Sequence, residues 1–474
     1  MKKRTALLLM VLTFIFGAAS MYIGIGWYGN MNISAVTTEQ GMSEKDLKKL
    51  NDVYKAISSQ YVSGVKKDKL IEGAVNGMVG SLDDPYTSYM SEKEAKQFME
   101  SLGSSFQGIG AEVGLIDGRV TIISPIKDTP AEKAGLKPND TILEIDGKST
   151  EGKSVNDAVK QIRGEKGTEV TLKILRSGSK EPFNVKIVRD DIPLITVHSN
   201  VENENGKKVG VIEITSFSEE TAKEFSTQLE KLEKENIDGL VIDVRGNPGG
   251  YLTSVEEILG ELITKEKPYL QIEDKQGNKE PYYTRLTEKK PYPIVGLIDN
   301  GSASASEILA GALKEAGKYE IVGEKSFGKG TVQQTMEIGD GSQLKVTMFK
   351  WLTPEGNWIH KKGIKPTVEV KQPEYYYVAH LDIDQPLTLD TTSEQVKNAQ
   401  LMLSGLGFDP ARTDGYFNDT TKSAVEAFQQ AHDLPVTGEI DEATAGTLES
   451  KTIEKIRSKE DDRQLQQALE IVTK

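Results

Sequence analysis

Apolar residues recur at different spacings in successive parts of the chain, and each spacing predicts a different kind of structure. Between residues 43 and 102 they recur at steps of three and four, as at Leu47 and Leu50, which is typical of amphipathic helices. From residue 104 to 188, short alternating runs are separated by turn-forming Gly, Pro, Asn and Asp residues, which predicts a strand-rich module with one helix over residues 154–162. The expected strands of this module cover residues 119–123, 141–145 and 169–175.

The pattern changes again near residue 192. Apolar strand-like runs at residues 209–214, 239–244 and 294–298 alternate with helical stretches at 218–235 and 254–263. Such alternation predicts an α/β core whose strand ends face a site. The chain as a whole is therefore expected to be a multidomain protein that combines α+β and α/β parts.

The length and the net charge of the chain limit the classes of protein to which it can belong. A chain of 474 residues is long enough for about three domains or more. Its 58 basic and 72 acidic side chains give a net charge of −14, which argues against a nucleic-acid binder. The absence of cysteine from the sequence excludes a thiol nucleophile, a disulfide and a cysteine metal site. We expect no metal and no other cofactor.

The N-terminal segment predicts export. Lys2, Lys3 and Arg4 precede an apolar run over residues 5–28, which is long enough to cross a hydrocarbon core of about 30 Å. The basic flank is expected to stay in the cytoplasm, which places the rest of the chain outside. We therefore expect a signal peptide or signal anchor over residues 1–30, with cleavage slow or absent because the apolar run continues past the small residues 16–20.

The stretch that begins at Gly301 carries the candidate chemistry. It places serines at Ser302, Ser304 and Ser306, before a helix, and a lysine, Lys329, between two glycines. None of the four histidines lies beside a serine in a recognisable elbow, so a hydroxyl nucleophile needs another base. A lysine can serve when burial disfavours its ammonium form and lowers its pKa. These residues favour a Ser/Lys hydrolase.

The strand-rich module has a glycine-bearing loop that leads into a strand. With Ala134-Gly135-Leu136 and the run from Asp140 to Gly147, it resembles a PDZ domain. The resemblance implies that the module binds a carboxy-terminal or unfolded peptide tail, and a plain folded spacer is the alternative. The expected peptide-binding residues are Gln107, Gly108, Ile109, Gly110 and Ala111. Arg163, at the end of the predicted helix, is a candidate contact that reports occupancy to the catalytic core, or else a solvated helix-end cation.

The last part of the chain is predicted to be helical at residues 396–406 and 420–431. This part resembles the small helical peptidoglycan-binding module in the order of three stretches: VKNAQLMLSGLGF, then DGYFNDTTKSAVEAFQQAHDL, then TGEIDEATAGTL. The resemblance implies attachment to the cell wall. A structural or dimer-forming role is the alternative.

Three motifs of the α/β segment, at residues 243–250, 301–307 and 324–333, resemble the C-terminal processing peptidases, a group within serine peptidase family S41. The resemblance is strongest to those of spore-forming Gram-positive bacteria, and it implies a core of the crotonase/ClpP-like kind and signalling between compartments during sporulation. It also implies Ser304 as the nucleophile, Lys329 as the base and Gln333 as the supporting residue.

The backbone around Ser304 is suited to an oxyanion. Ser304 lies just before a helix that Glu307, Ile308 and Leu309 are predicted to begin, and the N-terminus of a helix favours negative charge. The expected oxyanion donors are the N–H of Ala305 and one from Gly249 or Gly250, in the glycine turn after the strand at 239–244. Rival assignments remain open at this point. They are Ser302 or Ser306 as the nucleophile, Lys325 as the base, and Arg245 as a substrate contact rather than the partner of Asp243.

The expected domains are a signal segment (1–30), an N-terminal helical region that offers a dimer contact (43–102), a PDZ domain (103–190), the peptidase core (191–372), a peptidoglycan-binding-like domain (373–450) and a C-terminal helix (451–474). We expect an exported, homodimeric serine endopeptidase that cleaves proteins at or near their carboxy-terminal tails, with the PDZ domain inhibiting the site until a tail arrives. The alternatives are a non-catalytic wall-binding scaffold and an enoyl-hydratase-like enzyme.

Overall fold

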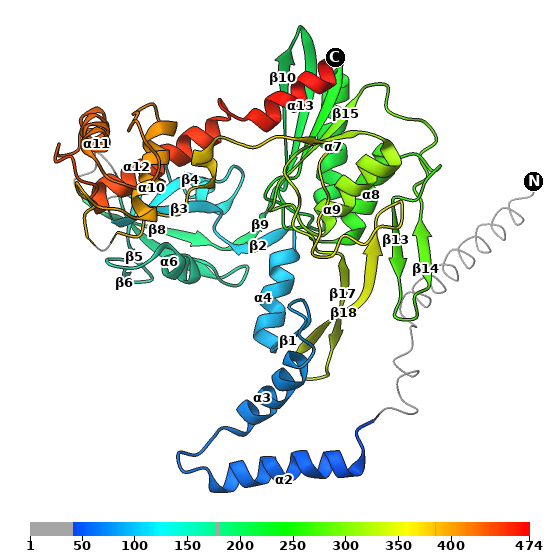
Figure 1. Cartoon of the computed structure of the whole chain (residues 1–474). Helices are drawn as coiled ribbons and strands as arrows, with labels where there is room; N and C mark the ends of the chain where they lie inside the picture. The colour runs from blue at the N-terminus through cyan, green and yellow to red at the C-terminus, as the bar shows by residue number, and fades with distance from the viewer. Residues whose placement is uncertain (1–40, 117, 177–180, 384) are drawn as a thin grey trace, which may run out of the picture. The chain divides into compact units, whose positions relative to one another are not determined.

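The computed structural model of this chain describes residues 41–116, 118–176, 181–383 and 385–474 (Figure 1). Its internal contacts define two compact units, Met1–Tyr89 and Met90–Lys474. The predicted signal segment at residues 1–30 lies outside the described residues. Within the described ranges, no helix combines the length and the apolar character that a membrane span requires.

The described residues of the first unit form two amphipathic helices, α2 (Glu44–Gln60) and α3 (Lys67–Gly80). Ser43 begins α2 as its N-cap, where its hydroxyl accepts a hydrogen bond from Asp46 N at 3.2 Å. Neither helix contains a buried residue. The side chains of Leu47 and Leu50 are 54% and 47% exposed, so no described residue of this unit covers the apolar stripe of α2.

Strand β1 (Ser88–Met90) spans the junction, and the second unit continues with α4 (Glu92–Leu102), which was predicted to belong with the N-terminal helices. A capping box starts α4: Ser91 is the N-cap, and its backbone N–H donates to Glu94 Oε2 at 2.9 Å. Glu94 is fully exposed, and its hydrogen bonds from Ser91 lower its pKa. Helix α4 leads to β2 (Ser105–Gly108), which pairs with β9 (Asp190–Pro193).

The strand-rich module forms an antiparallel sheet in the order β3-β4-β5-β7-β8, with β6 on β5. Its elements are β3 (Ala111–Ile116), β4 (Arg119–Pro125), α5 (Pro130–Lys133), β5 (Thr141–Ile145), β6 (Lys148–Ser149), α6 (Val155–Ile162), β7 (Glu169–Leu175) and β8 (Phe183–Val188). The predicted strands and helix are confirmed, because alternate residues such as Ile122, Ile142 and Leu172 face one buried core. Ser154 is the N-cap of α6.

The α/β core is built on a sheet in the order β10-β11-β12-β15-β16-β19, parallel except for the antiparallel β10–β11 pair. Its strands are β10 (Val197–Glu204), β11 (Lys207–Ile214), β12 (Gly239–Asp243), β15 (Ile294–Ile298), β16 (Glu320–Gly323) and β19 (Val368–Glu369). All residues of β12 and β15 are buried, because both sheet faces are covered, and this explains their continuous apolar sequences.

Helices cover the two faces of this sheet unequally. One face packs against α7 (Thr221–Lys234), α8 (Leu252–Leu262) and α9 (Ala305–Ala312), followed by the π-helical turn η2 (Leu313–Gly317). The other face packs against α13 (Arg463–Thr473), which lies along the strands in Figure 1 and contributes Leu465, Leu469 and Val472 to a buried cluster. The extreme C-terminal helix therefore completes the core.

Two further parts complete the second unit. A smaller antiparallel sheet contains β13 (Leu270–Glu273), β14 (Lys279–Tyr282), β17 (Thr331–Glu337) and β18 (Gln343–Leu352). The helical module contains η3 (Glu374–Tyr377), α10 (Glu394–Gly405), α11 (Asp419–Ala431) and α12 (Glu442–Ser458). The single helix expected over residues 451–474 is instead the end of α12 and α13, because Lys459 takes a left-handed φ of 57° that ends α12.

Candidate active site

Ser304 lies at a strained corner between a strand and a helix. The chain leaves β15, turns, and enters α9 with Ser304 as the N-cap residue at φ 55° and ψ −113°. A non-glycine residue in this region costs about 1–3 kcal/mol, and such residues cluster at functional sites. A serine on a sharp strand–turn–helix corner is the geometry of a nucleophile elbow, and the N-terminal end of the helix favours negative charge beside it.

The two neighbouring serines have structural roles. Ser302 Oγ donates to Val244 O at 2.8 Å, and Ser306 Oγ donates to Asn247 O at 2.9 Å. Both side chains are fully buried, whereas Ser304 is half-buried and lines a cavity. The structure therefore favours Ser304 over its rivals.

The cavity beside Ser304 has a volume of about 670 Å³. It brings together residues that are far apart in the sequence: Gly249, Gly250, Ser304, Lys329 and Gln333. Lys325, the rival base, is exposed and does not line this cavity, and neither does Ala305, which is buried behind it.

Gly249 and Gly250 allow the turn after β12 to close against Ser304. Their φ values are 101° and 149°, and a Cβ on Gly249 would lie 2.8 Å from both Ala303 O and Ser304 Cβ. The N–H of Gly249 already donates to Asn247 Oδ1 at 2.8 Å. Among the described residues, Gly250 N and Ala305 N donate no backbone hydrogen bond, so these two remain as the candidate oxyanion donors.

Glu307 links the loop of Ser304 to that of Lys329. Its carboxylate is fully buried and Oε2 accepts the backbone N–H of Ser304 at 2.9 Å and of Lys329 at 2.8 Å. Oε1 accepts Gly328 N at 2.7 Å and Ser326 Oγ at 2.5 Å. From the sequence, Glu307 was expected only to begin a helix. The Ser-x-x-Glu spacing of a capping box signals the bond to Ser304 N, but not the three bonds to the second loop.

Lys329 and Gln333 line the cavity from adjacent positions: Gln333 lies on β17, and Lys329 comes just before this strand. Lys329 is half-buried just before the strand, and its carbonyl accepts Trp351 Nε1 at 2.9 Å. Gln333 Nε2 donates to Thr331 Oγ1 at 3.0 Å and to Thr347 Oγ1 at 3.2 Å. The amide of Gln333 is thus held in a defined orientation toward the same cavity that Lys329 lines.

Tyr251 also lines the cavity. Burial raises the pKa of its hydroxyl, with a further contribution from the charge of Glu219, so the phenol is neutral at physiological pH.

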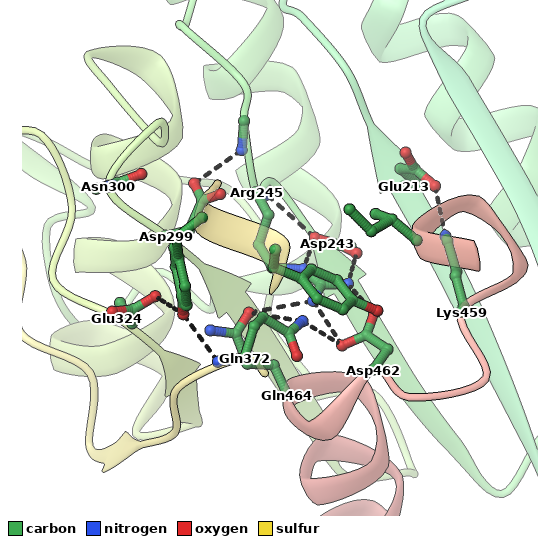
Figure 2. A pocket seen from close by; sticks show the side chains of 14 residues that line it. Glu213, Asp243, Arg245, Asp299, Asn300, Glu324, Gln372, Lys459, Asp462 and Gln464 are labelled. Carbon is green, nitrogen blue, oxygen red and sulfur yellow. Dashed lines mark hydrogen bonds and ion pairs between the residues drawn. The ribbon is translucent and has the colours of Figure 1, made fainter. Parts of the chain in front are cut away.

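Arg245 lies outside this cavity, in a second pocket beside the C-terminal segment (Figure 2). Its guanidinium donates from Nε and Nη2 to Asp243 at 2.9 and 2.6 Å, and from Nη1 and Nη2 to Asp462 at 2.8 Å each. Nη1 also donates to Gln464 Oε1 at 3.1 Å, so all five N–H groups have acceptors. Arg245 is therefore the buried partner of Asp243, the second of the two roles considered from the sequence.

This network depends on the charge of Asp462. Burial alone would raise the pKa of Asp462, but the hydrogen bonds and the charge of Arg245 lower it overall. We expect Asp462→Asn to lower the free energy of unfolding by about 3 kcal/mol at neutral pH, because the amide cannot replace both charge-assisted hydrogen bonds from Arg245, which keeps only Asp243 as its charged partner. Urea denaturation measures this loss.

The same variant has a pH signature. A carboxyl whose pKa is lowered by folding contributes stability above its unfolded value, and that contribution is lost as pH falls through the folded pKa. The difference between wild type and Asp462→Asn should therefore shrink below a pH of about 4. Asp461→Asn is the matched control, since its carboxylate is 47% exposed beside Lys455 and its loss should cost at most about 1 kcal/mol. Equal losses in both variants would contradict this account.

The predicted peptide-binding residues of the strand-rich module lie in one short segment. Gln107 and Gly108 end β2, Ile109 and Gly110 form the loop, and Ala111 begins β3. Two hydrogen bonds hold the loop in place: Ala131 N donates to Ile109 O at 2.7 Å, and Thr129 Oγ1 donates to Gly110 O at 2.9 Å.

Arg163 is the C-cap of α6 and lies over the ring of Phe106, 4.6 Å from its centroid. Its Cγ is 3.8 Å from the position that a Cβ on Gly108 would occupy. The structure places Arg163 beside the segment that carries the loop, with its side chain exposed to solvent, so both roles considered from the sequence stay open.

Comparison with known proteins agrees with this architecture. Family models match the chain as Peptidase family S41 (residues 208–370), a PDZ domain (107–187), a putative peptidoglycan binding domain (392–448) and the activating protease CtpB N-terminal domain (14–94). The chain is 53% identical over 460 residues to the carboxy-terminal processing protease CtpB of Bacillus subtilis, covering 96% of each chain.

Two further likenesses are more distant. The carboxy-terminal processing protease CtpA of Bacillus subtilis is 41% identical over 476 residues, with both chains fully covered. Among solved structures, the photosystem II D1 C-terminal processing protease is 26% identical, with a TM-score of 0.42 over 70% of this chain and 94% of that one.

The extent of the identity to CtpB and CtpA sets aside the two alternatives considered from the sequence, the wall-binding scaffold and the enoyl-hydratase-like enzyme. The chain belongs to peptidase family S41, among the carboxy-terminal processing proteases, and is a serine endopeptidase with a PDZ domain.

Proposed function

We propose that this protease cleaves protein substrates at or near their carboxy-terminal tails with Ser304 as nucleophile and Lys329 as general base. The observation that carries the proposal is the strained elbow of Ser304 in the same cavity as Lys329, with one buried carboxylate oxygen of Glu307 bonded to both backbones. A serine hydroxyl is a weak nucleophile until a nearby base removes its proton, and a neutral lysine amine can be that base.

The reaction follows from this arrangement. As Ser304 Oγ attacks the scissile carbonyl, its proton moves to Lys329 Nζ, and the oxyanion forms opposite Gly250 N and Ala305 N. Lys329 then gives the proton to the leaving amine, and the C–N bond breaks to leave an acyl ester on Ser304. Water attacks the ester with Lys329 again accepting the proton, and the acid product leaves as Ser304 regains its hydroxyl.

Cleavage of an unstructured protein tests the proposal. The wild type should release fragments that mass spectrometry places near the carboxyl end, and Ser304→Ala should release none. Ser306→Ala is the matched control. Its hydroxyl bonds only to a backbone carbonyl, so this variant should cleave whenever it folds. Equal cleavage by the wild type and Ser304→Ala would refute the assignment.

Gln333 is proposed to orient Lys329 without reacting. A neutral amide adds no charge that would stabilise the ammonium form and raise the pKa of the base. We expect Gln333→Ala to lower kcat about 10- to 100-fold with little change in KM, because an orienting contact is weaker than a proton transfer. Gln334→Ala, at the exposed neighbouring position, is the control. An unchanged kcat in Gln333→Ala would remove this residue from the site.

The PDZ domain is proposed to inhibit the protease until a substrate tail binds at the loop of residues 107–111. Binding would then shift an existing equilibrium toward the open state, as far as the tail prefers that state. Deleting residues 106–188 should accelerate cleavage of a short peptide if the domain inhibits. A domain that only tethers the substrate should leave peptide cleavage normal and abolish cleavage of a protein tail. Unchanged rates on both substrates would reject a regulatory role.

We also propose that the protein works as a homodimer outside the cytoplasmic membrane. The uncovered apolar stripe of α2, which includes Leu47 and Leu50, supports the dimer, and the basic–apolar sequence of residues 1–30 supports export with a membrane anchor or secretion. Sedimentation of wild type and Leu47→Glu/Leu50→Glu tests the first point. Protease accessibility of the protein on intact cells tests the second.

The C-terminal module is proposed to attach the protease to peptidoglycan, and signalling between compartments during sporulation is the proposed setting. The match of residues 392–448 to a peptidoglycan-binding model supports the first point. Co-sedimentation of the full chain with purified cell wall should exceed that of a chain without the module. Equal sedimentation would favour a structural role.

A further inference from the structure

The face of the β17–β18 hairpin that carries Gln333 also carries a second lysine, Lys345. Lys345 lies on β18 opposite Thr335 of β17, and both residues line the cavity that contains Ser304. Thr347, which accepts the hydrogen bond from Gln333, is two residues away on β18, so its side chain is on the same face. Two residues along a strand span about 6.6 Å, which places Lys345 just beyond Gln333 on the hairpin.

The ammonium group of Lys345 has an aromatic neighbour. Nζ lies 4.9 Å from the centroid of the Phe98 ring, and the side chain is half-buried. Within the part of the chain that the structure describes, no Asp or Glu forms an ion pair with Lys345, whereas Lys350 on the same strand is paired with Glu273 at 2.7 Å. A cation over a ring gains about 0.5–2 kcal/mol, so Phe98 can hold Lys345 in the cavity without neutralising its charge.

The direction of the reaction places this charge on one side of the scissile bond. In the proposed mechanism Lys329 returns its proton to the leaving amine, so the leaving fragment begins beside Lys329 at the foot of β17. Since Lys329, Gln333 and Lys345 line one cavity, a leaving fragment that runs from Lys329 along the hairpin would reach Lys345. Lys345 is positioned to contact that leaving fragment.

We propose that Lys345 forms a subsite for a carboxylate of the leaving fragment, and that this carboxylate is the carboxy terminus of the substrate. The inference rests on the proposed function, which places cleavage near the end of a chain, and it requires that the chain end being cleaved lies in this cavity and not at residues 107–111 when the bond breaks. A carboxylate would give the half-buried ammonium a charge-assisted hydrogen bond, which is stronger there than in bulk water. An Asp or Glu side chain has the same chemistry, and the experiment separates the two sources.

The test uses the full chain and three peptides of one sequence. The first ends in a free carboxylate, the second in a carboxamide, and the third is the carboxamide with one Glu in the leaving fragment. A series with the chain end two to six residues beyond the scissile bond finds the best length. At that length the wild type should cleave the free acid with about tenfold higher kcat/KM than the amide.

Lys345→Met should reduce this preference to within about twofold by slowing cleavage of the acid alone, and Lys345→Arg should retain most of it. Lys350→Met, which removes a lysine already paired with Glu273, should keep the full preference. If the Glu-containing peptide shows the Lys345-dependent gain instead, the subsite is supported with a side chain as its ligand. A full preference for the free acid in Lys345→Met, or no preference for any carboxylate in the wild type, overturns the proposal. Cleavage by Ser304→Ala at the wild-type rate would instead refute the proposed function.

Discussion

Replacing Lys329 with alanine is expected to lower kcat for peptide cleavage by about 10⁶-fold, and Ser304→Ala should do the same. The two residues serve one proton transfer, so the double variant should be hardly slower than either single variant. Lys325→Ala is the matched control, since this lysine lies in the same segment but is exposed and outside the cavity. Initial rates on a fluorogenic peptide measure all four variants.

Two results would contradict this prediction. Substantial turnover by Lys329→Ala would show that another group accepts the proton. A base that must lose its own proton also makes kcat/KM rise from mildly acidic to alkaline pH. That rise should persist when His198, His360, His380 and His432 are all replaced by glutamine. Its disappearance in that variant would indicate a histidine base.

Replacing Glu307 with glutamine is expected to damage both stability and catalysis. The carboxylate accepts four hydrogen bonds in a fully buried position, and a glutamine offers one oxygen and an NH₂ group that would face two of the donors. We expect the free energy of unfolding to fall by about 3 kcal/mol, since buried donors lose their acceptor. We also expect kcat to fall about 100-fold, because small displacements of catalytic groups have effects of this size.

The variant Glu324→Gln controls for loss of a nearby carboxylate. Glu324 is half-buried and accepts one hydrogen bond, from Tyr377 Oη at 2.6 Å. It should lower stability by no more than about 1 kcal/mol and leave kcat unchanged. A Glu307→Gln protein with normal kcat would show that the shared carboxylate does not position Ser304 and Lys329.

Local sequence signals predicted much of the fold. The predicted first and last residues of β5, β7 and β15 agree with those of the structure. Each of these strands is a short apolar or alternating run between turn-forming residues, which fixes its ends. The residues proposed for catalysis came from motif resemblance. The structure adds geometry to them, through the strained φ of Ser304 and the hydrogen bonds of Ser302 and Ser306.

Other features depend on contacts between distant segments. The role of Glu307 requires the loop of residues 326–329 to fold over α9, which no local pattern reports. Helix α13 packs on the core sheet although the whole helical module separates the two in the sequence. Asp462, just before α13, likewise bonds to Arg245, which is 217 residues away. The choice between Gly249 and Gly250 as oxyanion donor likewise depends on the side chain of Asn247.

The position of the serine that a reactive phosphonate modifies shows most directly which hydroxyl is the nucleophile. The full chain is incubated with a peptide that carries a serine-reactive phosphonate at its scissile position, and the adduct is located by mass spectrometry of the digested protein. We expect one adduct, on Ser304, which forms at least about 100-fold more slowly in Lys329→Ala and at the wild-type rate in Lys325→Ala. An adduct on Ser302 or Ser306, or labelling of Ser304 at full rate in Lys329→Ala, would contradict the Ser304–Lys329 assignment.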